Sequence, residues 1–264
     1  MKIIALVENI SDGSVKAKHG LSFYIETNKH KILFDVGPDK TLFENAKRKN
    51  IDLTKVDTVI ISHGHKDHGG ALKKFMEINK YARIYLQKSA FDKHLVKVLF
   101  LKIGISLDKR LMNDQRIVLI DGDHRIDDEL MLFTANSNDS FHSQANMNLY
   151  ADKQLDDFRH EHNLLIHENK NVVFMGCGHS GVIRILKSFS EIRPDYCIGG
   201  FHLFDPVSKK TVPKAQLDEL SEALEQFNDV KFYTCHCTGT DAYRYLKDRH
   251  KNISYFKCGR QLEI

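Results

Sequence analysis

The most constraining feature of this sequence is the segment 62–70, which reads SHGHKDHGG and follows an apolar run. It carries three imidazoles and one carboxylate within six positions, beside glycines that allow tight turns. Side chains alternate along an extended segment, so His63 and His65 emerge on one side and can bind one ion together. Asp67 and His68 follow on a turn and are expected to serve a second ion. The segment predicts a metal-dependent enzyme built around the end of a buried strand.

The donor atoms of this segment indicate which metals to expect. Imidazole nitrogen suits zinc, iron, manganese and nickel, whereas a carboxylate adds charge and hardness. We expect two divalent ions, with zinc favoured and iron or manganese as alternatives. The competing interpretation is a polar run on a solvated loop, and the position of the segment at the exit of a buried strand argues against it.

Hydrophobic periodicity alternates between strand and helix along the chain. Apolar runs predict strands at 2–8, 21–27, 30–36, 56–62, 82–87, 116–120, 130–135, 163–167, 171–176, 195–198, 230–234 and 253–257. Helical spacing predicts helices at 39–49, 69–79, 89–103, 180–190, 213–227 and 239–250. This order predicts an α/β fold in which two mixed sheets pack face to face with helices outside. Residues 135–162 are the weakest for regular structure and are expected to form a lid or substrate loop.

Composition limits the classes of protein to consider. The 264 residues contain four prolines and no Gly/Ser-rich linker, which predicts a single domain over residues 1–264. The net charge of +4 comes from 39 basic and 35 acidic residues without a long block of one sign, so no nucleic-acid partner is expected. The absence of a long apolar run and of a signal peptide predicts a cytoplasmic protein without a membrane partner. The odd number of cysteines, five, argues against a disulfide framework, and the oligomeric state stays open.

Two further predicted strands end at histidines. The segment 172–181, VVFMGCGHSG, runs from an apolar strand into a glycine-rich turn, which places His179 among residues from neighbouring strand ends. The segment 230–240, VKFYTCHCTGT, delivers His236 before a helix in the same way. We expect both histidines to bind metal. The cysteines on either side of His236 lie on the alternate face and are expected to serve mainly in packing or in support of the metal ligands.

A fourth predicted strand ends near His202, in the segment 198–204, IGGFHLF. Because the other positions already fill the metal site, we expect His202 to contact the substrate or to donate a proton. A buried histidine with a purely structural role is the alternative.

These motifs resemble the metallo-β-lactamase superfamily, whose signature is His-x-His-x-Asp-His after a strand. The segment 33–37, LFDVG, is similar to the Asp-x-Gly element of that family, which implies that Asp35 orients the metal-binding histidines. Capping of the following helix is the alternative role for Asp35. The resemblance implies a four-layer αβ/βα sandwich and makes His236 the last metal ligand. The motifs GCxHxG, GGFHL and CHCTG narrow it to the subgroup related to an archaeal enzyme that joins a dihydropterin to ribofuranosyl-aminobenzene phosphate.

The sequence departs from the family pattern at two points. In many relatives an aspartate after the strand bridges the two ions, and Cys177 stands at that place here. Cys177 either binds metal through its thiolate or is a buried, inert thiol. The family's third histidine for the first ion has no clear equivalent, so His179 is taken as its substitute. The other candidates for that position are His94, His124, His142, His160, His162 and His167. His94 and His250 lie in predicted helices, and we expect both to be surface residues.

The predicted dinuclear site would activate a water for attack, with Asp67 also able to take a proton. The leading hypothesis is therefore a metal-dependent hydrolase that acts on an anionic small molecule with a phosphoryl, acyl or lactone centre. One alternative is a pterin-linked transferase in which an arylamine displaces diphosphate. The other is a non-haem di-iron redox protein that receives electrons from an external donor.

Overall fold

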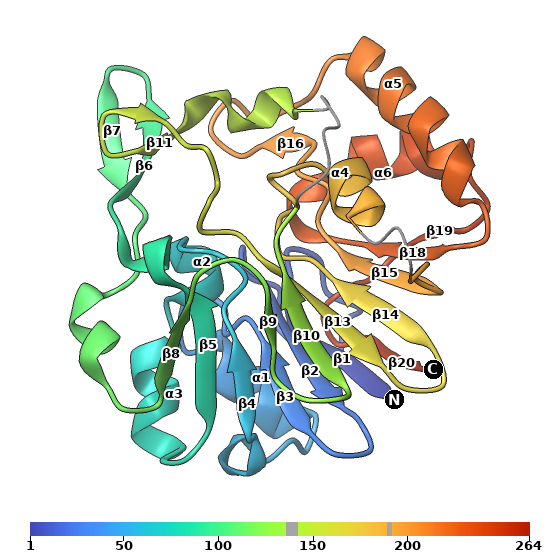
Figure 1. Cartoon of the computed structure of the whole chain (residues 1–264). Coiled ribbons are helices and arrows are strands. Elements are labelled where there is room, and N and C mark those ends of the chain that lie inside the picture. The colour runs from blue at the N-terminus through green and yellow to red at the C-terminus, as the bar shows by residue number, and fades with distance from the viewer. Residues whose placement is uncertain (136–141, 189–191) are drawn as a thin grey trace.

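Two mixed sheets stack face to face in the computed structural model of this chain (Figure 1). The structure describes residues 1–135, 142–188 and 192–264. In these residues the first sheet has seven strands in the order β20 (Gln261–Glu263), β1 (Lys2–Val7), β2 (Ser22–Glu26), β3 (Lys31–Phe34), β4 (Thr58–Ile60), β5 (Arg83–Gln87) and β8 (Ile117–Ile120). The second has seven in the order β19 (Ile253–Tyr255), β18 (Lys231–Thr234), β15 (Tyr196–Gly199), β14 (Asn171–Phe174), β13 (Asn163–His167), β10 (Leu130–Phe133) and β9 (His124–Arg125).

Each sheet joins an antiparallel part to a parallel part. In the first sheet β20, β1, β2 and β3 are antiparallel neighbours, and β3, β4, β5 and β8 run parallel. In the second sheet β9, β10, β13 and β14 are antiparallel, and β14, β15, β18 and β19 run parallel. The carboxyl ends of parallel strands meet at one edge of a sheet, so turns far apart in the sequence come together there.

Apolar side chains fill the space between the two sheets. Phe23 and Phe34 from the first sheet both contact Phe174 from the second, with ring centroids 6.0 and 5.8 Å apart. All three rings are fully buried. Burial of such a side chain contributes about 2 to 3 kcal/mol, so this layer holds the sheets together and fixes their strand ends relative to each other.

Helices cover the outer face of each sheet (Figure 1). The first sheet is covered by α1 (Thr41–Arg48) and α3 (Leu72–Ile78), and the short α2 (Lys66–Gly69) lies at its edge. The second is covered by α4 (Val182–Lys187), α5 (Lys214–Leu224) and α6 (Thr240–Lys247). Each helix has one apolar side that packs on its sheet, as Leu42 and Ala46 of α1 do. The two sheets and the helices on their outer faces therefore form four layers.

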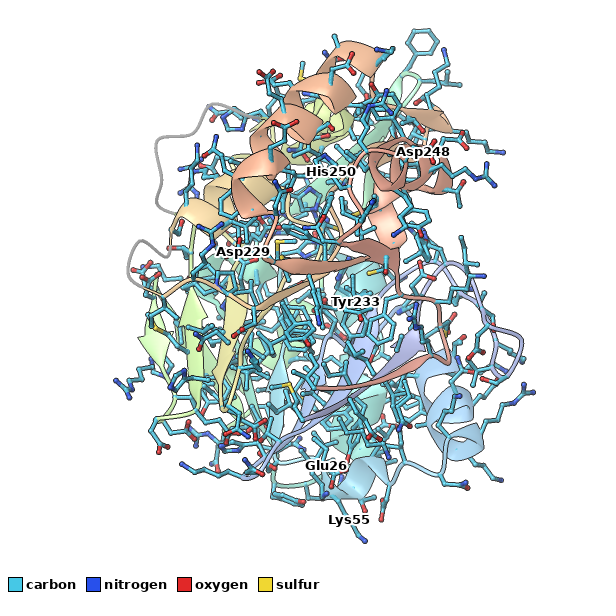
Figure 2. All side chains as sticks on the ribbon, turned by 90° about the vertical axis from the view of Figure 1, so that its right-hand side faces the viewer. Glu26, Lys55, Asp229, Tyr233, Asp248 and His250 are labelled. Atoms are coloured by element: carbon cyan, nitrogen blue, oxygen red, sulfur yellow. The ribbon has the colours of Figure 1, made fainter. Side chains whose placement is uncertain are left out.

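The end of α6 is fastened to α5 by a buried histidine. His250, labelled with Asp248 in Figure 2, is 5% exposed, and its Nε2 lies 2.8 Å from the Ser221 hydroxyl. Its helical spacing indicated a surface residue, and this interpretation was wrong. The contact belongs to the packing of the outer helices and lies away from the strand ends.

Residues 88–104 form an arm where the sequence predicted a helix over 89–103. The arm contains η2 (Lys88–Phe91) and a hairpin of β6 (His94–Val98) and β7 (Leu101–Gly104), which is extended by β11 (Leu149–Ala151) and β12 (Gln154–Leu155). The helix prediction was wrong because apolar residues occupy most positions here, so no single helical face is apolar. At the hairpin turn Leu99 has a φ of 54° and Phe100 is 98% exposed.

Short elements complete the chain. The predicted loop 135–162 contains η4 (Gln144–Asn148) besides β11 and β12, and its residues 136–141 lie outside the described residues, as do 189 and 190 of the predicted helix 180–190. The remaining elements are η1 (Leu53–Lys55), η3 (Lys109–Asn113), η5 (Glu225–Phe227), η6 (His236–Thr238), β16 (Phe204–Asp205) and β17 (Lys210–Thr211). Over the ranges described, no helix has the length and apolarity needed to cross a bilayer.

Candidate metal centre

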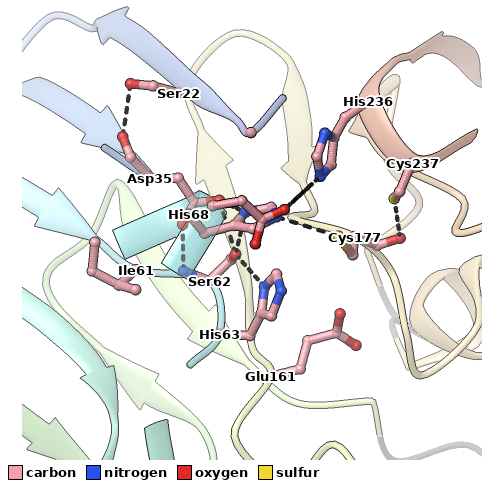
Figure 3. A network of polar contacts seen from close by, with 12 residues as sticks. Ser22, Asp35, Ile61, Ser62, His63, His68, Glu161, Cys177, His236 and Cys237 are labelled. Carbon is pink, nitrogen blue, oxygen red and sulfur yellow. Dashed lines mark hydrogen bonds and ion pairs between the residues drawn. The ribbon is translucent and has the colours of Figure 1, made fainter. Parts of the chain in front are cut away.

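Histidines from four strand ends converge between the two sheets. His63 follows β4 of the first sheet, whereas His179, His202 and His236 follow β14, β15 and β18 of the second. The parallel pairing of β14, β15 and β18 aligns the carboxyl ends of these strands. Segments separated by up to about 170 residues, as for His68 and His236, therefore meet at one place (Figure 3).

His63, His65 and His179 form the first group. One ligand atom of each lies within 4.8 Å of the others. The ring centroids of His63 and His65 are 4.5 Å apart, and His179 lies 4.9 and 5.1 Å from them. Such spacing lets three imidazoles face one ion.

His68, Cys177, Asp67 and His236 form the second group. Nε2 of His68 lies 3.3 Å from the Cys177 sulfur and 3.3 Å from Nε2 of His236. A carboxylate oxygen of Asp67 lies 3.4 Å from His236 Nε2 and 3.7 Å from His68 Nε2. Cys177 also lies within 4.8 Å of His63, so its sulfur sits between the two groups.

The electrostatics of the first group fit a bound cation. Burial lowers the pKa of His63, His65 and His179 far below the usual range, and repulsion from neighbouring histidines adds to this effect. The rings are therefore neutral. Nε2 of each is buried without a hydrogen-bond partner among the described residues. An unpaired buried polar atom is costly, and a divalent ion that accepts these lone pairs removes the cost.

Two asparagines orient two of the histidines in the same way. Oδ1 of Asn146 accepts a hydrogen bond from Nδ1 of His179 at 2.8 Å, and its Nδ2 donates to the His179 carbonyl at 2.9 Å. Asn9 holds His236 through Nδ1 at 3.0 Å and through the carbonyl at 3.2 Å. Each amide oxygen requires a proton on Nδ1, so the lone pair of Nε2 is directed into the site.

Two buried carboxylates fix the backbone beside the ligand residues and the ring of His68. Asp35 accepts hydrogen bonds from the Ser62 amide and hydroxyl at 2.8 Å each and from His68 Nδ1 at 2.7 Å (Figure 3). Glu161 accepts the amides of His179 and Ser180, both at 2.8 Å. Asp35 thus orients His68, and the alternative role as a helix cap is wrong, because Asp39 bonds the first turn of α1.

Glu8 does the same for His236. Its carboxylate accepts the His236 amide at 2.7 Å and the Tyr255 hydroxyl at 2.8 Å.

The backbone at Asp35, His202 and His236 has φ values of 61°, 47° and 52°, which residues other than glycine rarely adopt. Such strain persists only where surrounding contacts impose it, and it gathers here at the strand ends that carry the site.

A third polar cluster lies beside His65. Oδ2 of Asp156 lies 3.0 Å from Nδ1 of His94 and 3.2 Å from Nε2 of His160. The Gly64 amide donates to Nδ1 of His160 at 2.9 Å, so Nε2 of that ring carries the proton and donates to Asp156. His160 is therefore held as a hydrogen-bond donor, although atoms of His65, His94, Asp156 and His160 lie within 4.8 Å of one another.

Gly64 is required where His94 closes over it. A Cβ built on Gly64 would lie 2.4 Å from the Ala90 carbonyl and 2.7 Å from Nε2 of His94. The signature segment thus tolerates only glycine between its first two histidines. His94 itself is 2% exposed, which corrects the interpretation from the sequence that it is a surface residue.

The two metal-ligand groups open into a cavity of about 640 Å³. Its floor includes Cys177, His179, His202 and His236, and its rim carries Lys18 and Lys66. The arm and the region after β15 supply apolar walls, which include Val96, Val98, Ile105, Leu149, Phe204 and Val207. A small molecule in this cavity would touch the metal groups at one end and apolar side chains at the other.

The structure brings together every residue that the sequence singled out for the site. His63, His65 and His179 form one group, Asp67, His68, Cys177 and His236 form the other, and His202 lies 4.1 Å from His179 between ring centroids. Of the other histidines considered for the first ion, His142 is exposed, and His162 donates from Nε2 to the Ile61 carbonyl at 3.0 Å.

Sequence reasoning missed several partners. Asn9, Asn146, Glu8 and Glu161 hold the ligands but stand in no metal-binding motif. Cys237 was expected to pack or to support the ligands, and its sulfur lies within 4.8 Å of ligand atoms of Cys177 and His236. Only the convergence of strand ends reveals these contacts. The one signal in the sequence was the density of polar residues beside the strand ends.

Known proteins share this architecture. A sequence model described as the Metallo-beta-lactamase superfamily matches residues 15–129. An uncharacterized protein of Methanocaldococcus jannaschii is 28% identical over 269 residues, which cover 98% of this chain and 98% of that protein. The 7,8-dihydropterin-6-methyl-4-(beta-D-ribofuranosyl)-aminobenzene-5'-phosphate synthase of the same organism is 29% identical over 284 residues, which cover 95% of this chain and 92% of the synthase.

A solved structure matches along the whole chain. The crystal structure of Tm1679, described as a metal-dependent hydrolase of the beta-lactamase superfamily, has a TM-score of 0.82 at 24% identity. The match covers 100% of this chain and 99% of that one. At this identity the likeness establishes the fold, and the predicted α/β arrangement of two mixed sheets with outer helices is confirmed.

Proposed function

Because this chain belongs to the metallo-β-lactamase superfamily, we propose that it is an enzyme that uses two divalent metal ions to hydrolyse an anionic small molecule. The observation that carries the proposal is the convergence of two ligand groups at the floor of one cavity. His63, His65 and His179 would hold one ion, and Asp67, His68 and His236 the other, with Cys177 between them. The soft sulfur beside imidazoles favours zinc, with iron as the alternative and manganese less well matched.

The chemistry needs the ions and the side chains around them. When bound, two divalent cations polarise the scissile bond and activate a water for attack. One carboxylate oxygen of Asp67 lies 3.4 Å from Nε2 of His19 and 3.4 Å from Nε2 of His236. We assign to Asp67 the acceptance of the proton released during attack, and to His19 the stabilisation of its charge.

His202 is the candidate proton donor to the leaving group. It lines the cavity beside His179, and neither of its ring nitrogens has a hydrogen-bond partner among the residues described. A buried imidazole with both nitrogens unused is suited to a partner that arrives with the substrate. This supports the catalytic role over the purely structural one.

The cavity supports a substrate with two chemical parts. Lys18 and Lys66 at the rim and the metal ions on the floor favour an anionic group, such as a phosphoryl or carboxyl group or an opened lactone. The apolar walls favour a hydrophobic or flat body attached to it.

A second candidate function is a pterin-linked transfer reaction. Its support is the relative that is 29% identical over nearly the whole chain and is named as a dihydropterin-aminobenzene phosphate synthase. A flat pterin or aminobenzene ring would suit the apolar walls, and the metal ions would hold a diphosphate leaving group while the arylamine attacks.

Metal analysis and a substrate panel test the proposal. We expect the purified protein to hold about two equivalents of zinc or iron, and His65→Ala to lose most of this metal because it removes one ligand. His167→Ala, at an exposed histidine on β13, is the control. Retention of the full complement by His65→Ala with unchanged turnover would refute the assigned site.

The panel compares phosphodiesters, lactones and thioesters with a dihydropterin diphosphate plus a ribosylated arylamine. Release of the hydrolysis product without the arylamine supports a hydrolase. Turnover that requires the arylamine supports the transferase instead. A metal-loaded protein that turns over neither set would contradict both assignments of the substrate class.

A further inference from the structure

We propose that Cys177 and Cys237 are a modification site, at which a hydroperoxide joins the two thiols in a disulfide and so withdraws the Cys177 sulfur from the metal centre. The formation of the disulfide stands on the geometry of the two cysteines alone. Its effect on metal binding rests on the function proposed above.

The two thiols come from different strand ends and meet at the cavity floor. Cys177 follows β14 and Cys237 follows β18, with β15 between these strands in the sheet. Their sulfur atoms lie within 4.8 Å of each other. The Cys237 thiol donates to the Cys177 carbonyl at 3.4 Å, as Figure 3 shows. Formation of an S–S bond of about 2 Å would require the two side chains to turn toward each other.

Gly200 allows this approach. It follows the intervening strand β15, and a Cβ built on it would lie 2.4 Å from the Cys237 sulfur and 3.3 Å from Cys177 Cα. Any larger residue at position 200 would fill the space between the two cysteines. The glycine therefore leaves room for the Cys237 sulfur beside the backbone of Cys177.

The same pair can be reached from solvent. Cys177 and Cys237 both line the cavity of about 640 Å³ and are 3% and 5% exposed. Cys197, Cys235 and Cys258 are 0% exposed and do not line that cavity. A small hydroperoxide that enters the cavity thus meets this pair before the other thiols.

The chemistry is balanced by the hydroperoxide. One sulfur attacks a peroxide oxygen, so that an S–O bond forms, the O–O bond breaks, and water or an alcohol leaves. The second thiol then attacks the oxidised sulfur, the S–O bond breaks, and a second water leaves. The two cysteines lose two electrons and two protons, and the peroxide is reduced by the same two electrons.

The disulfide and the metal compete for one sulfur. The Cys177 sulfur lies 3.3 Å from Nε2 of His68, between the two ligand groups. A sulfur in a disulfide carries no thiolate charge, so it no longer helps to hold an ion. Bound metal should in turn protect Cys177 from oxidation, because each state excludes the other.

The experiment uses the full chain, stripped of metal with a chelator and treated with hydrogen peroxide. We expect the intact mass to fall by two hydrogen atoms, peptide mapping to join the peptides of Cys177 and Cys237, and zinc affinity to fall at least about tenfold. Dithiothreitol should restore zinc binding. Protein loaded with zinc before treatment should form the cross-link much more slowly.

Cys237→Ser is the matched variant, and Cys235→Ala, which changes the cysteine on the other side of His236, is the control. We expect Cys235→Ala to form the Cys177–Cys237 cross-link as the unaltered protein does, and Cys237→Ser to give no cross-linked peptide. The peptide map of the unaltered protein needs no variant, so a poorly folded variant does not weaken the test.

Three outcomes separate the two proposals. Absence of the Cys177–Cys237 cross-link in metal-free protein would overturn the modification site. Formation of the cross-link with unchanged zinc affinity would overturn its coupling to the metal centre. Failure of the reduced protein to bind zinc or iron at all would instead count against the proposed function and leave the thiol chemistry standing.

Discussion

Asn146 and Asn9 each hold one histidine by the same two hydrogen bonds, one to Nδ1 of the ring and one to the backbone carbonyl. His160 has the opposite arrangement, because its Nδ1 accepts a hydrogen bond from the Gly64 amide. The partner at one ring nitrogen thus decides what the other can do. His179 and His236 keep a lone pair at Nε2 in the candidate metal centre, whereas His160 keeps a proton at Nε2 to donate.

Removal of one asparagine tests this idea. Asn146→Ala should lower the metal affinity of the protein about 10- to 100-fold, because His179 loses the contact that fixes its ring and its proton. The measurement is competition for zinc against a chromogenic chelator. Asn148→Ala is the control, since the Asn148 amide donates to Asp205 at 2.9 Å instead of holding a ligand histidine. Equal zinc affinities for the two variants would show that the hydrogen bonds between Asn146 and His179 do not contribute to metal binding.

The sequence could predict some of these residues and not others. His63, His65, Asp67 and His68 are close in the chain, so their spacing alone indicated a metal site. Asn146 and His179 are 33 residues apart, and Asn9 and His236 are 227 apart. No periodicity links such pairs. They come together only because strands of the two sheets end at the same place.

The secondary-structure elements likewise divide into those that the sequence predicts and those that it does not. The strands that end at the site were predicted because buried parallel strands read as continuous apolar runs. The arm was predicted as a helix because β6 and β7 are also densely apolar, and only their pairing with β11 distinguishes a hairpin from a buried helix. Local sequence therefore located the elements that are buried on both faces. It failed where pairing with a distant segment determines the structure.

Asp156 connects β6, the segment that carries His160 and the segment 62–70. Its substitution tests how much this connection stabilises the fold. Its carboxylate bonds His94 at the start of β6 and also His160, which in turn accepts the Gly64 amide of the segment 62–70. Its other oxygen accepts the Phe158 amide at 2.9 Å. In Asp156→Asn the new NH₂ group must face either that amide or the N–H of His160, so one donor stays unmatched. We expect the free energy of unfolding to fall by about 3 kcal/mol.

Urea denaturation followed by circular dichroism measures this loss. The neighbouring Asp157→Asn is the control, because Asp157 is half-exposed and pairs with the exposed Arg159. We expect that variant to change stability by less than about 0.5 kcal/mol. If Asp156→Asn behaves like the control, the cluster does not connect the elements as described.

On the scale of the whole molecule, the two sheets are also joined at the edge opposite the metal centre. His30, in the turn between β2 and β3, lies 3.0 Å from Asp57 and 2.7 Å from Asp127, which precedes β10 of the second sheet. Both partners are carboxylates, so both ring nitrogens must donate, and the imidazole must be charged. The contact thus joins the sheets through a partly exposed ion pair whose strength depends on pH.

This contact gives stability a predictable pH dependence. Burial opposes the charge on His30, but hydrogen bonds with Asp57 and Asp127 outweigh it and raise the pKa of the ring above its usual 6.5. A raised folded-state pKa means that the stabilisation is complete below the unfolded pKa and is lost as pH rises through the folded value. We expect the wild type to exceed His30→Gln by about 1 kcal/mol near pH 6 and by much less near pH 9. His167→Gln, at an exposed ring that hydrogen-bonds the Asn171 amide oxygen, is the control. Denaturation curves at the two pH values check both, and a His30→Gln difference that stays constant or grows with pH would show that this ring is not the charged link between the sheets.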